Sequence, residues 1–189
     1  MKEFSLHKEW VLEAIKYAAS NDVLIINAAG NHNTNLDEAK NYYPNDSDYV
    51  SGEVADNFIN VGGSSYDINK NLKLWASNYG KETVDIFAPG EHIFSTSPNN
   101  KYEFVDGTSF AAPIVSGIAA LIRSQYPDLS ASEVKKILME SGSSYDVMVN
   151  IADEDEEIEM VPFSSLSKSG KIVNAYNALL LAKKIAKNK

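Results

Sequence analysis

A serine hydroxyl at the start of a predicted helix is the side chain in this sequence best placed to do chemistry. Ser109 stands in the segment Asp106-Gly107-Thr108-Ser109-Phe110-Ala111-Ala112-Pro113, which opens a run that is apolar on almost every side. The first N–H groups of a helix have no partner within it and carry positive partial charge, so they would stabilise an alkoxide or oxyanion at Ser109. The pattern also fits a serine that only caps the helix, because Ser is common at that position.

The segment around Ser109 differs from the strand–turn–helix motif that carries the nucleophile of α/β-hydrolases. That motif reads Gly-x-Ser-x-Gly, and here its last position is Ala111. A small-molecule α/β-hydrolase therefore has little support.

The Asn31 amide is a second polar group in a suggestive place. An almost continuously apolar run from 23 to 29 predicts a buried parallel strand, and Gly30-Asn31 follows at its C-terminal end. Parallel sheets place their ligand sites at that end of their strands. An amide there could donate a hydrogen bond to an oxyanion without adding charge. Taken alone, Asn31 also fits a turn former.

The elements that must position these groups alternate between helical and strand patterns, which predicts an α/β fold: three-layer, with a mostly parallel sheet. The helix from 109 to 125 lacks a polar face and is expected inside the protein. The acidic stretch within 143–165 is expected as a loop or edge hairpin, and 33–56 as a surface excursion. The pattern predicts helices at about 6–20, 109–125, 130–140 and 173–186, buried strands at 23–29, 58–63 and 84–88, and a hairpin of 93–97 with 102–105.

Composition narrows the possible partners. The chain has 189 residues, 44% of them hydrophobic, which fits one domain with a sizeable core. The net charge of -9 argues against a nucleic-acid partner, because neutralising phosphates needs clustered Lys and Arg. The absence of cysteine excludes disulfides. No run approaches the roughly 18 apolar residues that span a bilayer, and the first residues lack the apolar core of a signal peptide.

Several separated blocks together resemble the second half of the catalytic domain of subtilisin-like serine proteases, the subtilases. Residues 1–189 are accordingly identified as the C-terminal portion of such a domain, with 146–162 the least matched part. The blocks, in the family's order, are Ala28-Ala29-Gly30-Asn31, Phe58-Ile59-Asn60-Val61-Gly62-Gly63, Trp75-Ala76-Ser77-Asn78-Tyr79-Gly80, Val84-Asp85-Ile86-Phe87-Ala88-Pro89-Gly90, Gly107-Thr108-Ser109-Phe110-Ala111-Ala112-Pro113 and Gly170-Lys171-Ile172-Val173-Asn174-Ala175.

The resemblance implies a serine endopeptidase that cleaves proteins or peptides through an acyl-enzyme. Ser109 matches the nucleophile, and Asn31 matches the side-chain donor of the oxyanion hole. Ala28, Ala29 and Gly30 match a wall of the pocket for the substrate side chain that precedes the cut.

The resemblance also implies that the Asp and His of the triad lie upstream of this sequence. His7, His32 and His92 do not match the family base and are expected at the surface, while Asp85 and Asp106 match ordinary positions. Because a serine hydroxyl without a base is nearly inert at neutral pH, the isolated chain is expected to have negligible peptidase activity.

No cofactor is expected. The acidic run 153–157 lacks the Gly-punctuated spacing of a calcium loop, so a solvated loop is favoured over a calcium site. Family analogy places the protein outside the cytoplasm or in the cell envelope. Apolar surface left uncovered by the missing half predicts self-association.

The alternative is a natural non-catalytic module that keeps the subtilase fold for binding or assembly. A reading frame that continues upstream into an Asp-x-Gly strand and a His-Gly-Thr-His helix would favour the enzyme, and a start codon at Met1 would favour the module.

Overall fold

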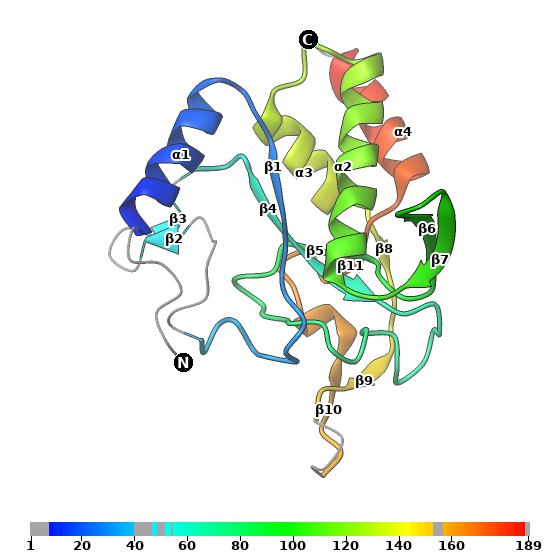
Figure 1. The fold of residues 1–189 in the computed structure, drawn as a ribbon. Coiled ribbons are helices and arrows are strands. Elements are labelled where there is room, and N and C mark those ends of the chain that lie inside the picture. Colours follow the sequence, from blue (N-terminus) through cyan, green and yellow to red (C-terminus); the bar gives the residue numbers. More distant parts are fainter. Residues whose placement is uncertain (1–7, 40–46, 49–51, 54, 153–156, 188–189) are drawn as a thin grey trace.

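A central five-stranded sheet organises the computed structural model, which describes residues 8–39, 47–48, 52–53, 55–152 and 157–187 (Figure 1). Its strand order is β1-β4-β5-β11-β8, with the first four parallel and the last pair antiparallel. The α/β class with a mostly parallel sheet is thereby confirmed. The bounds are β1 Ile25–Ala28, β4 Phe58–Ser64, β5 Ile86–Pro89, β11 Lys171–Ile172 and β8 Ser143–Ser144.

Three helices cover one face of this sheet: α2 Thr108–Gln125, α3 Ala131–Ser141 and α4 Ala175–Ala186. Side chains alternate across a strand, so Ile86 and Ala88 of β5 face the helices while Phe87 faces the other way. The inward side chains of β4 and β5 pack with Val115 and Ile122 of α2, all of them fully buried. This helix–sheet core holds the start of α2 at a fixed place on the sheet.

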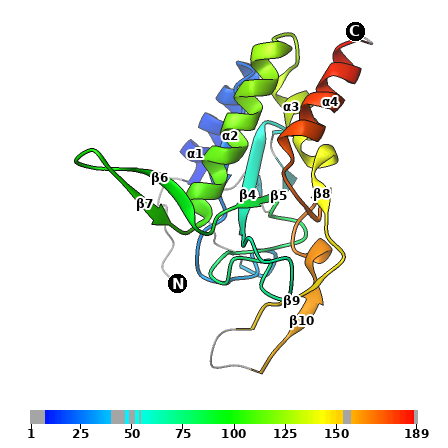
Figure 2. The same ribbon diagram turned by 90° about the vertical axis from the view of Figure 1, so that its right-hand side faces the viewer.

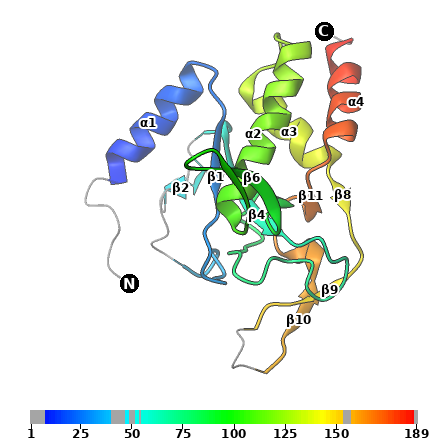
Figure 3. The same cartoon turned by 45° about the vertical axis from the view of Figure 1, so that its right-hand side comes forward.

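The second face is covered by loops and short strands. Phe87 packs there against Phe163, with ring centroids 5.0 Å apart. Position 62 must be glycine, because a Cβ there would lie 2.6 Å from the Phe87 ring. The covering segment comprises β9 Met148–Asn150, β10 Met160–Pro162 and the short helix η1 Phe163–Ser165. Figure 3 shows β9 and β10 below the sheet, away from α2, α3 and α4.

The remaining elements lie at the margins. Helix α1 Lys8–Ser20 flanks β1, which is an edge strand of the central sheet (Figure 1). Strands β2 Ser47–Asp48 and β3 Gly52–Glu53 form a small antiparallel pair. Strands β6 Ile93–Ser97 and β7 Lys101–Val105 form the predicted hairpin, which projects from the body of the molecule in Figure 2.

Each predicted helix is present, with ends within about two residues of those expected from the pattern. The apolar pattern of α2 predicts cover on all sides in a complete domain, whereas in this chain the helix is buried along one face only. Pro113, Gly117 and Leu121 on its outer side are exposed. Strands β8 and β11 were not predicted, since two residues are too few to show a period. Most of the acidic run, 153–156, lies outside the described residues.

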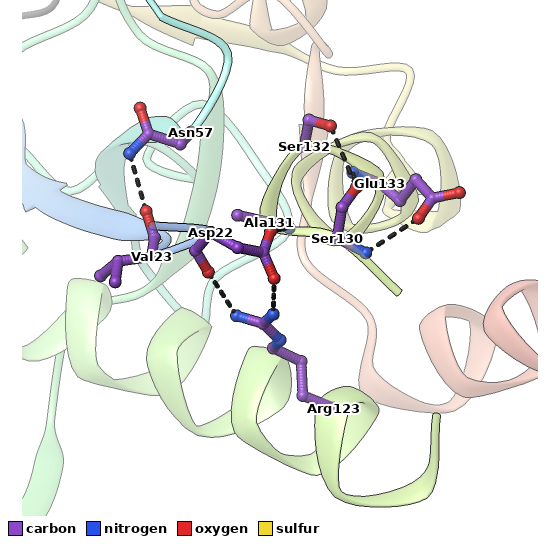
Figure 4. A network of polar contacts seen from close by, with 8 residues as sticks. All are labelled: Asp22, Val23, Asn57, Arg123, Ser130, Ala131, Ser132 and Glu133. Atoms are coloured by element: carbon purple, nitrogen blue, oxygen red, sulfur yellow. Dashed lines mark hydrogen bonds and ion pairs between the residues drawn. The ribbon is translucent and has the colours of Figure 1, made fainter. Parts of the chain in front are cut away.

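Asp22 joins the turn between α1 and β1 to two helices on the sheet (Figure 4). Its carboxylate pairs with the Arg123 guanidinium near the end of α2 and accepts a hydrogen bond from the Ala131 N–H at 2.6 Å. Ala131 opens α3, so the carboxylate satisfies one of the N–H groups that this helix leaves without an internal partner. A capping box of Ser130 and Glu133 is formed beside it.

Asp22→Ala should lower the free energy of unfolding by about 2 kcal/mol, because it removes the acceptor and the ion pair and leaves alanine at a φ of 56°. Asp22→Asn keeps an acceptor and tolerates that φ, so its loss should stay below about 1 kcal/mol. Urea unfolding of both variants measures the difference. Equal losses would contradict a stabilising hydrogen bond to Ala131.

Candidate active site

Ser109 lies in the first turn of α2, at the C-terminal edge of the sheet. The helix begins at Thr108, and its cap residue is Gly107, which makes no side-chain capping bond. Ser109 therefore does not cap the helix. Its side chain is exposed and makes no hydrogen bond with any residue that the structure describes. The hydroxyl is thus accessible at the positive end of a helix.

The Asn31 side chain meets the residue directly before Ser109. Its Oδ1 accepts hydrogen bonds from the Thr108 N–H at 2.9 Å and from Thr108 Oγ1 at 3.0 Å. Thr108 Oγ1 in turn accepts from the Gly30 N–H at 3.1 Å. Because a backbone N–H can only donate, the oxygen of the amide must face Thr108. Hydrogen bonds therefore run both from the start of α2 to the segment after β1 and from that segment to the start of α2.

This orientation leaves the Asn31 Nδ2 group available as a donor. Within the described ranges Nδ2 makes no hydrogen bond, and Asn31 is exposed. Nδ2 lies beside Gly107, where a Cβ would come within 3.3 Å of it. The amide can thus donate to a group bound next to the start of α2.

Close backbone packing brings the end of β5 to the same place. The Gly107 N–H donates to the Gly90 carbonyl at 2.7 Å. A Cβ at position 90 would lie 3.1 Å from the Gly107 oxygen, and Gly107 itself has a φ of 135°, which favours glycine. Two glycines are therefore needed for this approach.

The three residues expected to line a substrate pocket directly precede Asn31. Ala28 and Gly30 are partly exposed, and the fully buried Ala29 packs into the core on the second face of the sheet. Ala29 thus supports the segment from inside, whereas Ala28 and Gly30 present surface.

The two described histidines are exposed, as expected, and neither is hydrogen-bonded to Ser109. The His92 ring lies between Tyr66 and Phe104, with centroids 5.7 and 5.5 Å away. The backbone N–H of His92 donates to Asp106 Oδ1 at 2.6 Å. His7 lies outside the described residues.

Asp85 is a buried carboxylate at the other end of β5. It is 2% exposed and accepts from the Asn60 N–H at 2.7 Å. Lys168 Nζ and Lys135 Nζ lie 3.3 and 3.8 Å from its other oxygen. Asp85 precedes β5, whereas Gly90 follows it toward Ser109, so this carboxylate joins structural segments away from the candidate site.

Sequence reasoning did not identify Thr108 as the link between Ser109 and Asn31. A threonine at a helix start is common, so only its contacts distinguish it.

In the part of the chain that the structure describes, no group of three or more His, Cys, Asp or Glu side chains could hold a metal ion. The described helices are all too short or too polar to span a bilayer.

Gly107→Ala should destabilise the protein by about 1–3 kcal/mol, because alanine is strained at this φ and its Cβ would press on Asn31. Gly117→Ala on the same helix is the matched control. A Cβ there meets nothing within 4 Å, so it should stabilise by about 0.5–1 kcal/mol. Thermal or urea unfolding measures both. Opposite signs are expected, and a neutral Gly107→Ala would contradict the tight approach to Asn31.

Known proteins provide an independent comparison. The model of the Subtilase family matches residues 2–168. Subtilisin DY of Bacillus licheniformis is 36% identical over 132 residues, which make up 70% of this chain and 44% of that protein. The major intracellular serine protease of Bacillus subtilis (strain 168) is 39% identical over 145 residues, 74% of this chain and 42% of that protein. This chain thus spans less than half the length of these relatives.

Solved structures agree on the fold. A structure of the subtilase cytotoxin SubAB superposes with a TM-score of 0.74 at 24% identity, covering 98% of this chain and 57% of that one. A protease of Pseudoalteromonas arctica PAMC 21717 gives a TM-score of 0.67 at 28% identity, covering 90% and 46%. With a family model matched over most of its length, this chain belongs to the subtilase family.

Proposed function

We propose that this chain supplies the nucleophile and an oxyanion donor of a serine endopeptidase. Ser109 is the nucleophile and the Asn31 amide is the donor. The observation that carries the proposal is the bond of Asn31 Oδ1 to Thr108, because it holds the amide beside Ser109 and leaves Nδ2 free to donate. Membership of a family that includes named serine proteases supports the same chemistry.

The proposed reaction is acyl transfer to Ser109. Its Oγ attacks the carbonyl carbon of the scissile peptide bond, and its proton passes to a base. The carbonyl oxygen becomes an oxyanion, which accepts hydrogen bonds from Asn31 Nδ2 and from the Ser109 N–H; that N–H lies in the first turn and has no acceptor within the helix. Collapse of the intermediate expels the amine, which takes the proton back from the base. Water then hydrolyses the acyl-serine ester by the same route.

The base and its acidic partner are proposed to come from chain outside these 189 residues. Neither described histidine is hydrogen-bonded to Ser109. The chain also spans less than half the length of the two Bacillus relatives above. The part of those relatives that it does not match is long enough to contain a histidine base and its acidic partner. We therefore regard residues 1–189 as the C-terminal portion of a catalytic domain.

In the polypeptide that joins this chain to the segment with the base, Ser109→Ala should reduce kcat by about 10⁶-fold, a figure taken over from subtilisin. Asn31→Ala should reduce it by about 10²–10³-fold, also the subtilisin value, with little change in KM. His32→Ala is the matched control, because this exposed neighbour of Asn31 should leave kcat unchanged. Peptide hydrolysis by the variants measures all three. Full activity of Ser109→Ala would refute the proposal.

The isolated chain should react with a fluorophosphonate probe far more slowly than a complete subtilase does, since no base activates Ser109. Gel fluorescence after labelling, with Ser109→Ala as background, measures this. Labelling of Ser109 at a normal protease rate would contradict the absence of a base. If the joined polypeptide is also inert while it folds and binds peptides, the non-catalytic module replaces the enzyme.

We further propose that the isolated chain self-associates. The hairpin of β6 and β7 exposes Phe94 and Phe104, at 61% and 64%, and β1 is an edge strand of the central sheet among the described residues. Large exposed aromatic side chains and free strand edges favour association. Light scattering at increasing concentration should show a growing mass, and a constant monomer mass would contradict it.

Two further points complete the proposal, and the second rests on family analogy. We propose that catalysis needs no cofactor, because side-chain and backbone groups supply every step of the acyl transfer, so a chelator should leave kcat unchanged. We also propose that the protein is exported or held in the cell envelope. One relative is named an intracellular protease, so subtilases also work inside cells, and fractionation of the source cells decides the location.

A further inference from the structure

We propose that Asn78 is a positioning residue for Asn31, a role that deepens the proposed function above and rests on it. Asn78 is fully buried, at 0% exposure, and lies 47 residues further along the chain than Asn31. Its side chain and backbone bind the segment 29–34 on both sides of Asn31. Among the described residues, Asn78 makes no hydrogen bond to Ser109 or to the Asn31 side chain, so its proposed effect on catalysis passes through that segment.

The sheet stops holding the chain just before Asn31. Strand β1 ends at Ala28, and its last link to β4 is the Ala29 N–H to the Val61 carbonyl at 2.9 Å. Beyond this point none of the described strands pairs with the backbone of residues 30–34. Some other partner must therefore hold the residue that carries the oxyanion donor.

Beyond the end of β1, Asn78 supplies hydrogen bonds to the backbone. Before Asn31, its Nδ2 donates to the Ala29 carbonyl at 2.8 Å and its backbone N–H donates to the Gly30 carbonyl at 2.9 Å. After Asn31, its Oδ1 accepts from the N–H groups of His32 and Thr34, each at 3.0 Å. One residue thus fixes four backbone groups around Asn31, and its amide uses both its oxygen and its nitrogen.

Asn78 is itself held rigidly. The Ser77 Oγ donates to the Asn78 carbonyl at 2.9 Å and accepts from the Gly63 N–H of β4 at 2.9 Å. The nearly buried Lys73 ammonium donates to the Trp75 carbonyl at 2.9 Å and to Asn33 Oδ1 at 2.7 Å. The segment 73–78 is therefore tied to the central sheet and to the segment that it positions.

This arrangement matters because an oxyanion donor must stand where the charge develops. A misplacement of about 1 Å can cost about 10²-fold in rate. Thr108 fixes the Asn31 side chain, whereas Asn78 fixes the backbone from which that side chain extends. Both are needed to define where Nδ2 points.

The first test uses this chain and needs no activity. Asn78→Leu keeps the branched shape and the number of non-hydrogen side-chain atoms, and it removes the three hydrogen bonds of the side-chain amide. Asn57→Leu is the matched control, because Asn57 is 1% exposed and its Nδ2 binds the Val23 carbonyl at 2.7 Å, before the other end of β1 (Figure 4). Two-dimensional NMR follows the Asn31 side-chain amide and the exchange rate of the Thr108 N–H, at a temperature where both variants are folded.

Asn78→Leu should shift the Asn31 amide signals and speed the Thr108 exchange at least tenfold, whereas Asn57→Leu should leave both unchanged. Comparable effects of both variants would show general loosening and overturn the proposal. So would unchanged signals in Asn78→Leu. If either leucine variant does not fold, Asn78→Ser and Asn57→Ser replace the pair.

The second test is kinetic and uses the polypeptide that also contains the base. Asn78→Leu should reduce kcat by about 10- to 10²-fold with less than about a threefold change in KM. In an Asn31→Ala background the same change should cost less than about threefold, because the group it positions is gone. Additive losses would overturn the positioning role.

The failures of the two proposals are distinguishable. Activity that survives Ser109→Ala overturns the proposed function, while the NMR result still decides whether Asn78 positions Asn31. A normal response to Ser109→Ala together with additive Asn31 and Asn78 losses overturns only the inference.

Discussion

The bonds of the Asn31 amide to Thr108 are the interaction on which the candidate site depends. They join the end of β1 to the start of α2, two segments 77 residues apart in sequence. The contact is possible only because Gly107 has no side chain beside the amide and adopts a φ that favours glycine. The contact orients the amide, because its oxygen accepts hydrogen bonds from Thr108 and its nitrogen can donate to a ligand.

The rest of the fold serves to keep that contact in place. Parallel strands end at one edge of the sheet, and the core between β4, β5 and α2 holds the helix start against that edge. Gly90 lets β5 approach Gly107 from the other side. Where the sheet no longer holds the chain, the buried Asn78 continues the hydrogen bonding. The exposed hydroxyl of Ser109 is therefore held at the start of a helix that is packed firmly against the sheet.

Apolar side chains are exposed on α2 and on the hairpin of β6 and β7. The outer face of α2, the hairpin of β6 and β7 and the edge of β1 all present apolar groups or strand edges to solvent. Helices with an almost wholly apolar surface are usually buried on all sides. The exposure of α2 fits a chain that spans less than half the length of its bacillar relatives.

The sequence by itself determined the class of fold, the position of the helices, and a family in which Ser109 and Asn31 have assigned roles. Those features follow from local periodicity and from short blocks in a fixed order. Only the tertiary structure showed that Gly107, and not Ser109, caps α2, that Thr108 carries the link to Asn31, and that Asn78 binds around Asn31. The hydrogen bonds of Thr108 and Asn78 join residues far apart in the chain, so no local pattern encodes them. The cap depends on the exact residue at which α2 begins, and a sequence pattern places that start only to within a residue or two. The two-residue strands β8 and β11 are too short to show a period, and only their neighbours in the sheet define them.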